Sequence, residues 1–117
     1  MKANSELLRR VSLLRKYASR LGVKTVITST VRTRKQQAQL YANRSSNPYP
    51  VSPPGYSAHE YGLAADIVTV PSEYQTWLSS ISGNFGLFSY PGDEIHFQII
   101  SRDAFRSLLA RFFSGGT

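Results

Sequence analysis

The chain contains no cysteine and no long hydrophobic run. Without cysteine, its 117 residues form no disulfide and offer no thiolate to a metal. No stretch approaches the roughly 18 apolar residues of a membrane span. The first residues lead into an amphipathic pattern, so no signal peptide is expected. A chain of this length is predicted to form one domain, residues 1–117, with a core that needs no covalent cross-links.

Acidic residues are scarce in the first half of the chain. Residues 1–50 contain eleven Lys and Arg but only one acid, Glu6, whereas residues 51–117 contain three basic and six acidic residues. The net charge of +7 favours attraction to a polyanion such as nucleic acid, anionic lipid or an acidic cell-wall polymer. The alternative is a solvated helix face that serves only solubility.

The spacing of the apolar residues predicts a mixture of helices and strands. Helices are expected over residues 5–21, 33–43 and 71–83 and after Ser101, the last with Phe105, Leu108, Leu109 and Phe112 on one face. Strands are expected over residues 23–29, 85–90 and 94–100, and within the apolar run 64–70 from near Asp66 onward. Because these elements mix without regular alternation, the fold class is predicted to be α+β.

Residues 44–56 are predicted to form a long loop, because they contain four of the six prolines together with Ser, Asn and Gly. Long ordered loops often carry function. This loop leads directly into Ser57, so it is expected either to form a wall of a substrate groove or to be a passive connection.

Histidine is also rare, and the two histidines lie in segments that resemble two halves of one metal site. His59 is followed seven residues later by Asp66, and His96 lies in a second segment with Asp93 and Glu94. Three protein ligands, His59, Asp66 and His96, would leave the fourth position of a catalytic zinc ion open to water. Asp66 lies among apolar residues, where an unpaired carboxylate is costly.

Each of these three residues has an ordinary alternative, as a surface histidine, a hydrogen-bonded strand histidine or a salt-bridged aspartate. The pair His59-Glu60 also begins the H-E-x-x-H motif of metalloprotease helices. Leu63 occupies the position of the second histidine, and Gly62 suits a helix interior badly, so that motif is excluded.

Two motifs resemble the signature of the M15 or LAS-type zinc peptidases, which include D-alanyl-D-alanine carboxypeptidases and L-alanyl-D-glutamate endopeptidases of bacteria and phages. They are Ser57-x-His59-x-x-Gly62-x-Ala64-x-Asp66 and Asp93-x-x-His96-Phe97. An upstream segment, Ser29-Thr30-Val31-Arg32-Thr33 with Gln37 and Leu40-Tyr41, is similar to the S-G-Y-R-S…Q…L-Y segment of the family, with Thr30 in place of Gly. The resemblance covers about residues 25–98.

The resemblance implies a small α+β domain of the LAS or hedgehog-like type, in which a central antiparallel sheet holds one zinc ion. The implied zinc ligands are His59, Asp66 and His96. Asp93 matches the general base of the family. Ser57 and Arg32 match positions that contact the peptide substrate, and Gln37 is expected to support the same pocket.

Strand geometry leaves a rival for the general base. If residues 94–100 form a strand, Glu94 and His96 face the same side, because side chains alternate. Asp93 would then lie at the mouth of the strand, beside Gly92. The spacing of the family motif favours Asp93 over Glu94.

The resulting prediction is a zinc metallopeptidase that hydrolyses an amide bond in the stem peptide of peptidoglycan. The bond would be L-Ala-D-Glu or D-Ala-D-Ala. Small size, positive charge and the lack of a signal peptide favour a monomeric phage endolysin or virion-associated lysin. Such a lysin would be made in the cytoplasm, act on the wall and be attracted to anionic wall polymers or lipopolysaccharide.

Two other classes of function remain as alternatives. One is a catalytically silent wall-binding or phage structural module on the same scaffold. The other is a nucleic-acid binder, which is not expected because the aromatic residues lie at core-like spacings. These aromatic residues are Phe85, Phe88, Phe97 and Phe105.

Overall fold

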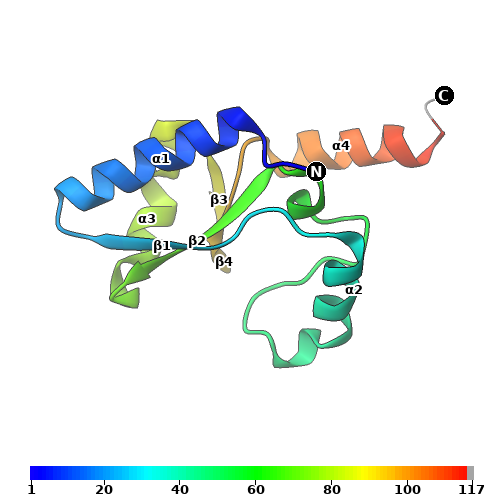
Figure 1. Cartoon of the computed structure of the whole chain (residues 1–117), viewed down its shortest axis with the longest axis horizontal. Coiled ribbons are helices and arrows are strands. Elements are labelled where there is room, and N and C mark those ends of the chain that lie inside the picture. Colours follow the sequence, from blue (N-terminus) through cyan, green and yellow to red (C-terminus); the bar gives the residue numbers. More distant parts are fainter. Residues whose placement is uncertain (116–117) are drawn as a thin grey trace.

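A four-stranded antiparallel sheet forms the centre of the molecule (Figure 1). The computed structural model describes residues 1–115, so the last two residues of the predicted domain lie outside the described part. The strand order is β1-β2-β4-β3. The strands are β1 (Lys24–Ser29), β2 (Ala64–Val70), β3 (Phe88–Tyr90) and β4 (Asp93–Gln98). The predicted α+β class with a central antiparallel sheet is therefore confirmed.

Four α-helices and four short 3-10 turns complete the described chain. The helices are α1 (Ser5–Arg20), α2 (Arg34–Ala42), α3 (Gln75–Ile81) and α4 (Arg102–Phe113). The 3-10 turns are η1 (Arg44–Ser46), η2 (Ala58–Tyr61), η3 (Ser72–Tyr74) and η4 (Ser82–Phe85). No helix within residues 1–115 is long and apolar enough to span a membrane.

Helix α1 forms where the apolar spacing predicts it. The Asn4 side chain caps its start by accepting hydrogen bonds from the backbone N–H groups of Glu6 and Leu7. Its apolar face buries four side chains, Leu7, Val11, Leu14 and Ala18. These side chains pack with α3 and with one face of the sheet into the main hydrophobic core.

The alternation of side chains along β2 and β4 separates this core from a polar site. Ile67 and Phe97 are fully buried in the core with α1 and α3. Their sequence neighbours Asp66 and His96 point to the opposite face, and they are direct partners in the antiparallel register. The sheet therefore places a carboxylate and an imidazole side by side.

Several predicted elements differ from the structure. The strand expected to begin near Asp66 begins at Ala64, and the strand expected over residues 85–90 begins only at Phe88, because η4 extends to Phe85 and Gly86 caps it.

The third helix begins at Gln75, after a 3-10 turn, because the Gln75 side chain hydrogen-bonds to the backbone of β2 and β4. Gly83 lies inside η4, and the chain instead reverses at Gly86, where φ is 74°. In α4 only Phe105 and Leu109 are buried, while Leu108 and Phe112 are exposed, because this helix projects from the body (Figure 1).

Candidate metal centre

His59 is held in a short turn that leads into β2. The hydroxyl of Ser57 accepts a hydrogen bond from the backbone N–H of His59 and caps η2. Gly62 ends η2 with a φ of 70°, and a Cβ atom there would lie 2.6 Å from the carbonyl oxygen of Lys2. Any other residue at position 62 would be strained and would clash with the N-terminal segment. Gly62 thus lets the chain turn from His59 towards Asp66.

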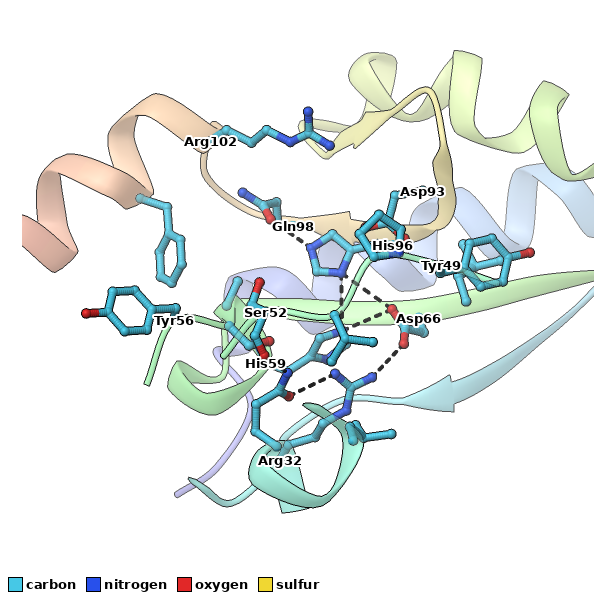
Figure 2. Close-up of a pocket in the computed structure, with 18 of the residues that line it drawn as sticks. Arg32, Tyr49, Ser52, Tyr56, His59, Asp66, Asp93, His96, Gln98 and Arg102 are labelled. Atoms are coloured by element: carbon cyan, nitrogen blue, oxygen red, sulfur yellow. Dashed lines mark hydrogen bonds and ion pairs between the residues drawn. The ribbon is translucent and has the colours of Figure 1, made fainter. Parts of the chain in front are cut away.

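Three ligand atoms from the predicted residues converge on one point (Figure 2). His59 Nε2 lies 3.0 Å from Asp66 Oδ1 and 3.2 Å from His96 Nδ1. His96 Nδ1 lies 3.5 Å from the same oxygen of Asp66. The structure therefore brings together the three residues that the sequence proposed as zinc ligands.

The outward-facing nitrogen of each histidine determines which tautomer is present. His59 Nδ1 lies 2.6 Å from the backbone carbonyl oxygen of Thr30, which can only accept a hydrogen bond. His96 Nε2 lies 2.7 Å from Oε1 of Gln98, whose amide nitrogen donates to the carbonyl of Ile100. Each neutral imidazole must therefore donate outward, so its lone pair points towards Asp66 Oδ1.

Two imidazole lone pairs and a carboxylate oxygen repel one another unless a cation lies between them. Ligand atoms about 2.0–2.1 Å from a tetrahedral zinc ion are separated from each other by about 3.3 Å. The observed separations of 3.0, 3.2 and 3.5 Å match the three edges of such a tetrahedron. The donor set and its geometry therefore fit zinc.

Ionisation within this cluster also favours a central positive charge. Burial opposes the charged form of Asp66. Without a metal, when the inward ring nitrogens carry a proton in place of a lone pair, hydrogen bonds from His59 and His96 outweigh that effect and hold the pKa of Asp66 well below its usual range. Burial likewise opposes protonation of His96, but the hydrogen bond to Asp66 outweighs it and raises the pKa of His96. Without a metal, a proton takes the place of the cation.

The second oxygen of Asp66 is fixed by a chain of polar side chains. Arg32 Nη2 donates to Asp66 Oδ2 at 2.8 Å, and Arg32 Nη1 donates to Gln37 Oε1 at 3.2 Å. The buried Gln37 side chain in turn donates to the backbone carbonyl of Ser52 at 2.9 Å. Such outer partners orient metal ligands. In the structure, Arg32 and Gln37 therefore support a metal ligand and the 44–56 loop.

A cavity of about 460 Å³ opens over the three ligand residues His59, Asp66 and His96, here called the metal cluster. Its floor includes the ligand residues, one wall is formed by residues 47–52 of the predicted loop, and another by α4. Ser57, Arg32 and Gln37 also line the cavity. The 44–56 loop is therefore a wall of the candidate site and not a passive connection.

Asp93, rather than Glu94, lines this cavity together with His96. Burial raises the pKa of the Asp93 carboxyl, and the nearby charge of His96 only partly offsets that effect. Glu94 instead contributes its backbone carbonyl, which accepts a hydrogen bond from Gln75. A carboxylate with a raised pKa beside a metal site suits general acid–base chemistry.

Three contributors to the site were missed from the sequence. Thr30 acts through its backbone carbonyl, which leaves no signal in the sequence. Gln98 lies two residues beyond His96 on the same strand face, so strand alternation could have found it. The pair Arg102 and Arg106 lies four residues apart on α4, a spacing that places both on one helix face.

Comparison with known proteins identifies the family. The D-alanyl-D-alanine carboxypeptidase family VanY matches residues 1–105, which is most of the chain. The protein belongs to this family, and the predicted M15-type zinc metallopeptidase class is confirmed. No curated protein sequence is significantly similar to the chain.

Several solved structures share the fold. The vancomycin-resistance D,D-pentapeptidase VanY in complex with Zn(II) has a TM-score of 0.70 and 22% identity, over 92% of this chain and 78% of its own. The LD-carboxypeptidase LdcB has a TM-score of 0.67 and 19% identity, over 96% and 72%. The L-Ala D-Glu endopeptidase ChiX from Serratia marcescens has a TM-score of 0.62 and 19% identity, over 87% and 84%.

Proposed function

We propose that this protein is a zinc-dependent peptidase that hydrolyses an amide bond in the stem peptide of peptidoglycan. The observation that carries the proposal is the convergence of His59, Asp66 and His96 on one point, with Asp93 in the same cavity. Similar structures include VanY in complex with D-alanine-D-alanine and LdcB, described for its recognition of peptidoglycan.

In this proposal His59, Asp66 and His96 hold the zinc ion. When bound, zinc supplies Lewis acidity towards a carbonyl oxygen and lowers the pKa of water. Asp93 accepts the proton of the attacking water and returns it to the leaving amine, a role that its raised pKa supports. Arg32 holds Asp66 in its ligating orientation, while Ser57 and Gln37 shape the cavity beside the substrate.

The D-Ala-D-Ala bond is the first candidate for cleavage, because the family that matches the chain is named for that activity. The L-Ala-D-Glu bond is the second, since ChiX, which shares the fold, is an L-Ala D-Glu endopeptidase. Delivery as a phage lysin, with the basic N-terminal half attracted to anionic wall polymers, remains part of the proposal.

The test is to incubate the zinc-loaded protein with purified peptidoglycan and with soluble stem pentapeptide. Released D-Ala and new amino termini are followed by mass spectrometry. Cleavage by the wild type, loss of zinc in His96→Ala, and loss of activity with zinc retained in Asp93→Asn would support the proposal. Glu94→Gln is the matched control, because Glu94 does not line the cavity.

A wild-type protein that binds zinc but cleaves neither substrate would favour the alternative, a silent wall-binding module on the same scaffold. The product mass separates the two activities. Release of D-Ala alone identifies a carboxypeptidase, whereas a new D-Glu amino terminus identifies an endopeptidase.

A further inference from the structure

Helix α4 presents two arginines to the cavity over the metal cluster. Arg102 and Arg106 lie one turn apart and both line the cavity. In Figure 2, Arg102 lies on the opposite side of the histidines from Arg32. The cavity therefore has basic groups on two opposite sides, and of these Arg32 is the one bonded to a ligand residue, Asp66.

The arginines on the two sides differ in their partners. Arg32 is engaged by Asp66 and Gln37, so its guanidinium already has acceptors within the protein. Among the described residues 1–115, Arg102 makes no ion pair, and its guanidinium lies over the ring of Tyr90, 3.9 Å from the ring centroid. Stacking of this kind holds the guanidinium in place but leaves its N–H groups without an acceptor.

Arg106 is also available to a ligand. Its one ion pair within the described chain is a contact of 3.9 Å with Asp103, and its side chain is 75% exposed. Such a long, exposed contact contributes little free energy. Arg106 can therefore turn towards an anion in the cavity at small cost.

The charge of the cavity is consistent with an anionic ligand. Three arginines line it against two aspartates, Asp66 and Asp93. A divalent cation on the cluster would add two further positive charges. A net positive charge in a cleft raises the local concentration of anionic ligands.

We propose that Arg102 and Arg106 form a subsite for a substrate carboxylate, on the α4 side of the cavity and across the histidines from Arg32. The inference rests on the proposed function and narrows its substrate class to stem peptides in which this carboxylate is free rather than amidated. Two carboxylates of a stem peptide have the required chemistry. One is the C-terminal carboxylate of D-Ala, and the other is the α-carboxylate of D-Glu.

The experiment compares three soluble stem pentapeptides: one with both carboxylates free, one amidated at the C-terminus and one amidated at the D-Glu α-carboxylate. The wild type is expected to favour the free peptide by about tenfold in kcat/KM, mainly through KM, over the peptide that lacks the recognised carboxylate. The peptide that shows this loss identifies the source of the carboxylate.

Arginine variants connect that preference to the subsite. Arg102→Gln and Arg106→Gln are expected to slow cleavage of the free peptide more than cleavage of the unrecognised amide, so that the preference of the wild type shrinks towards one. Arg102→Lys, which keeps the charge, should retain part of the preference. Arg111→Gln is the matched control, because Arg111 lies on α4 but does not line the cavity. Circular dichroism and zinc content verify that each variant folds.

Equal cleavage of all three peptides by the wild type would overturn the subsite. It would also be overturned if Arg102→Gln slowed every peptide equally and shifted the pH profile, since Arg102 would then act through the nearby Asp93.

Calorimetric binding of the same peptides to zinc-loaded Asp93→Asn gives a readout without turnover. Carboxylate-dependent binding without any wild-type cleavage would retain the subsite and reject the peptidase. Cleavage without a carboxylate preference would retain the peptidase and reject the subsite. Peptides that all bind equally, or that do not bind at all, would also reject the subsite.

Discussion

The floor and the walls of the cavity are built in different ways. On the floor, β2, β4 and η2 hold His59, Asp66 and His96, and each ligand group has a further partner that orients it. The walls are the 44–56 loop and α4, whose charged residues Arg102 and Arg106 are exposed. The difference indicates that the sheet fixes the geometry of the ligand groups, whereas the walls present exposed charged side chains to the cavity.

The largest effect is expected from removing a ligand on the floor. Asp66→Ala removes the one anionic ligand and leaves Arg32 without its partner at 2.8 Å. Zinc binding should be lost, and activity should fall by on the order of a thousandfold. Zinc content and kcat/KM measure this, with the exposed Glu73→Gln as the control. A variant that keeps one equivalent of zinc would show that the floor is not the metal site.

The next-largest effect is expected from removing a side chain that orients a metal ligand without being one. Gln98→Leu removes the acceptor of the His96 Nε2 proton, at 2.7 Å, without touching a ligand. The imidazole then loses its preferred tautomer, so zinc affinity should fall by roughly 10- to 100-fold. A competition titration with a chromogenic chelator measures the change. Unchanged affinity would mean that Gln98 plays no part in orienting His96, and Gln39→Leu on α2 is the control.

A smaller effect is expected from the hydrogen bonds that connect the 44–56 loop to η2. Glu60 accepts hydrogen bonds from the Gly55 N–H, and the Tyr61 hydroxyl donates to the Gly55 carbonyl at 2.8 Å. Glu60→Ala leaves that N–H unsatisfied, which should cost about 1–3 kcal/mol in the free energy of unfolding and raise KM without loss of zinc. Urea denaturation and steady-state kinetics measure the two effects. Glu60→Gln retains an acceptor oxygen and should recover most of the loss; failure to do so would point to the charge instead.

The smallest effects lie outside the cavity, in the acid dependence of stability. Hydrogen bonds from Arg9 and Arg10 lower the pKa of the exposed Glu6 from 4.5 to about 2. Because the folded pKa lies below the unfolded one, the stabilisation by Glu6 is present above pH 4.5 and is lost as the pH falls towards 2. Glu6→Gln should therefore flatten the decline in unfolding midpoint over this range. A parallel decline in both proteins would contradict the assignment.

Glu60 titrates with the opposite sign. Burial raises its pKa above 4.5 in the folded protein, so its contribution is largest below pH 4.5 and decreases as the pH rises through the folded pKa. Measured over the same pH range, Glu60→Gln and Glu6→Gln should therefore change the slope of stability against pH in opposite directions.

Local signals in the sequence were enough to predict many elements of this fold. The capping box of Thr33 and Gln36, the apolar stripe of α1 and the Pro-Gly turn before β4 depend on contacts between near neighbours in the chain, so the sequence predicts them. Two features were not predictable because they depend on residues distant in the sequence. Helix α3 starts at Gln75, whose side chain bonds to the backbone of β2 and β4. Helix α4 exposes part of its apolar face, because only Phe105 and Leu109 pack against the second core cluster.

For the site, the sequence by itself determined the ligand types, since its two histidines lie in motifs that match a known family. The tertiary structure decided the tautomers, the inward position of Asp93 over Glu94, and the basic wall of Arg102 and Arg106. The physical reason is that a ligand set depends on residue identity, which the sequence states directly. Orientation and charge balance depend instead on which distant backbone and side-chain groups the folded sheet brings within hydrogen-bonding distance.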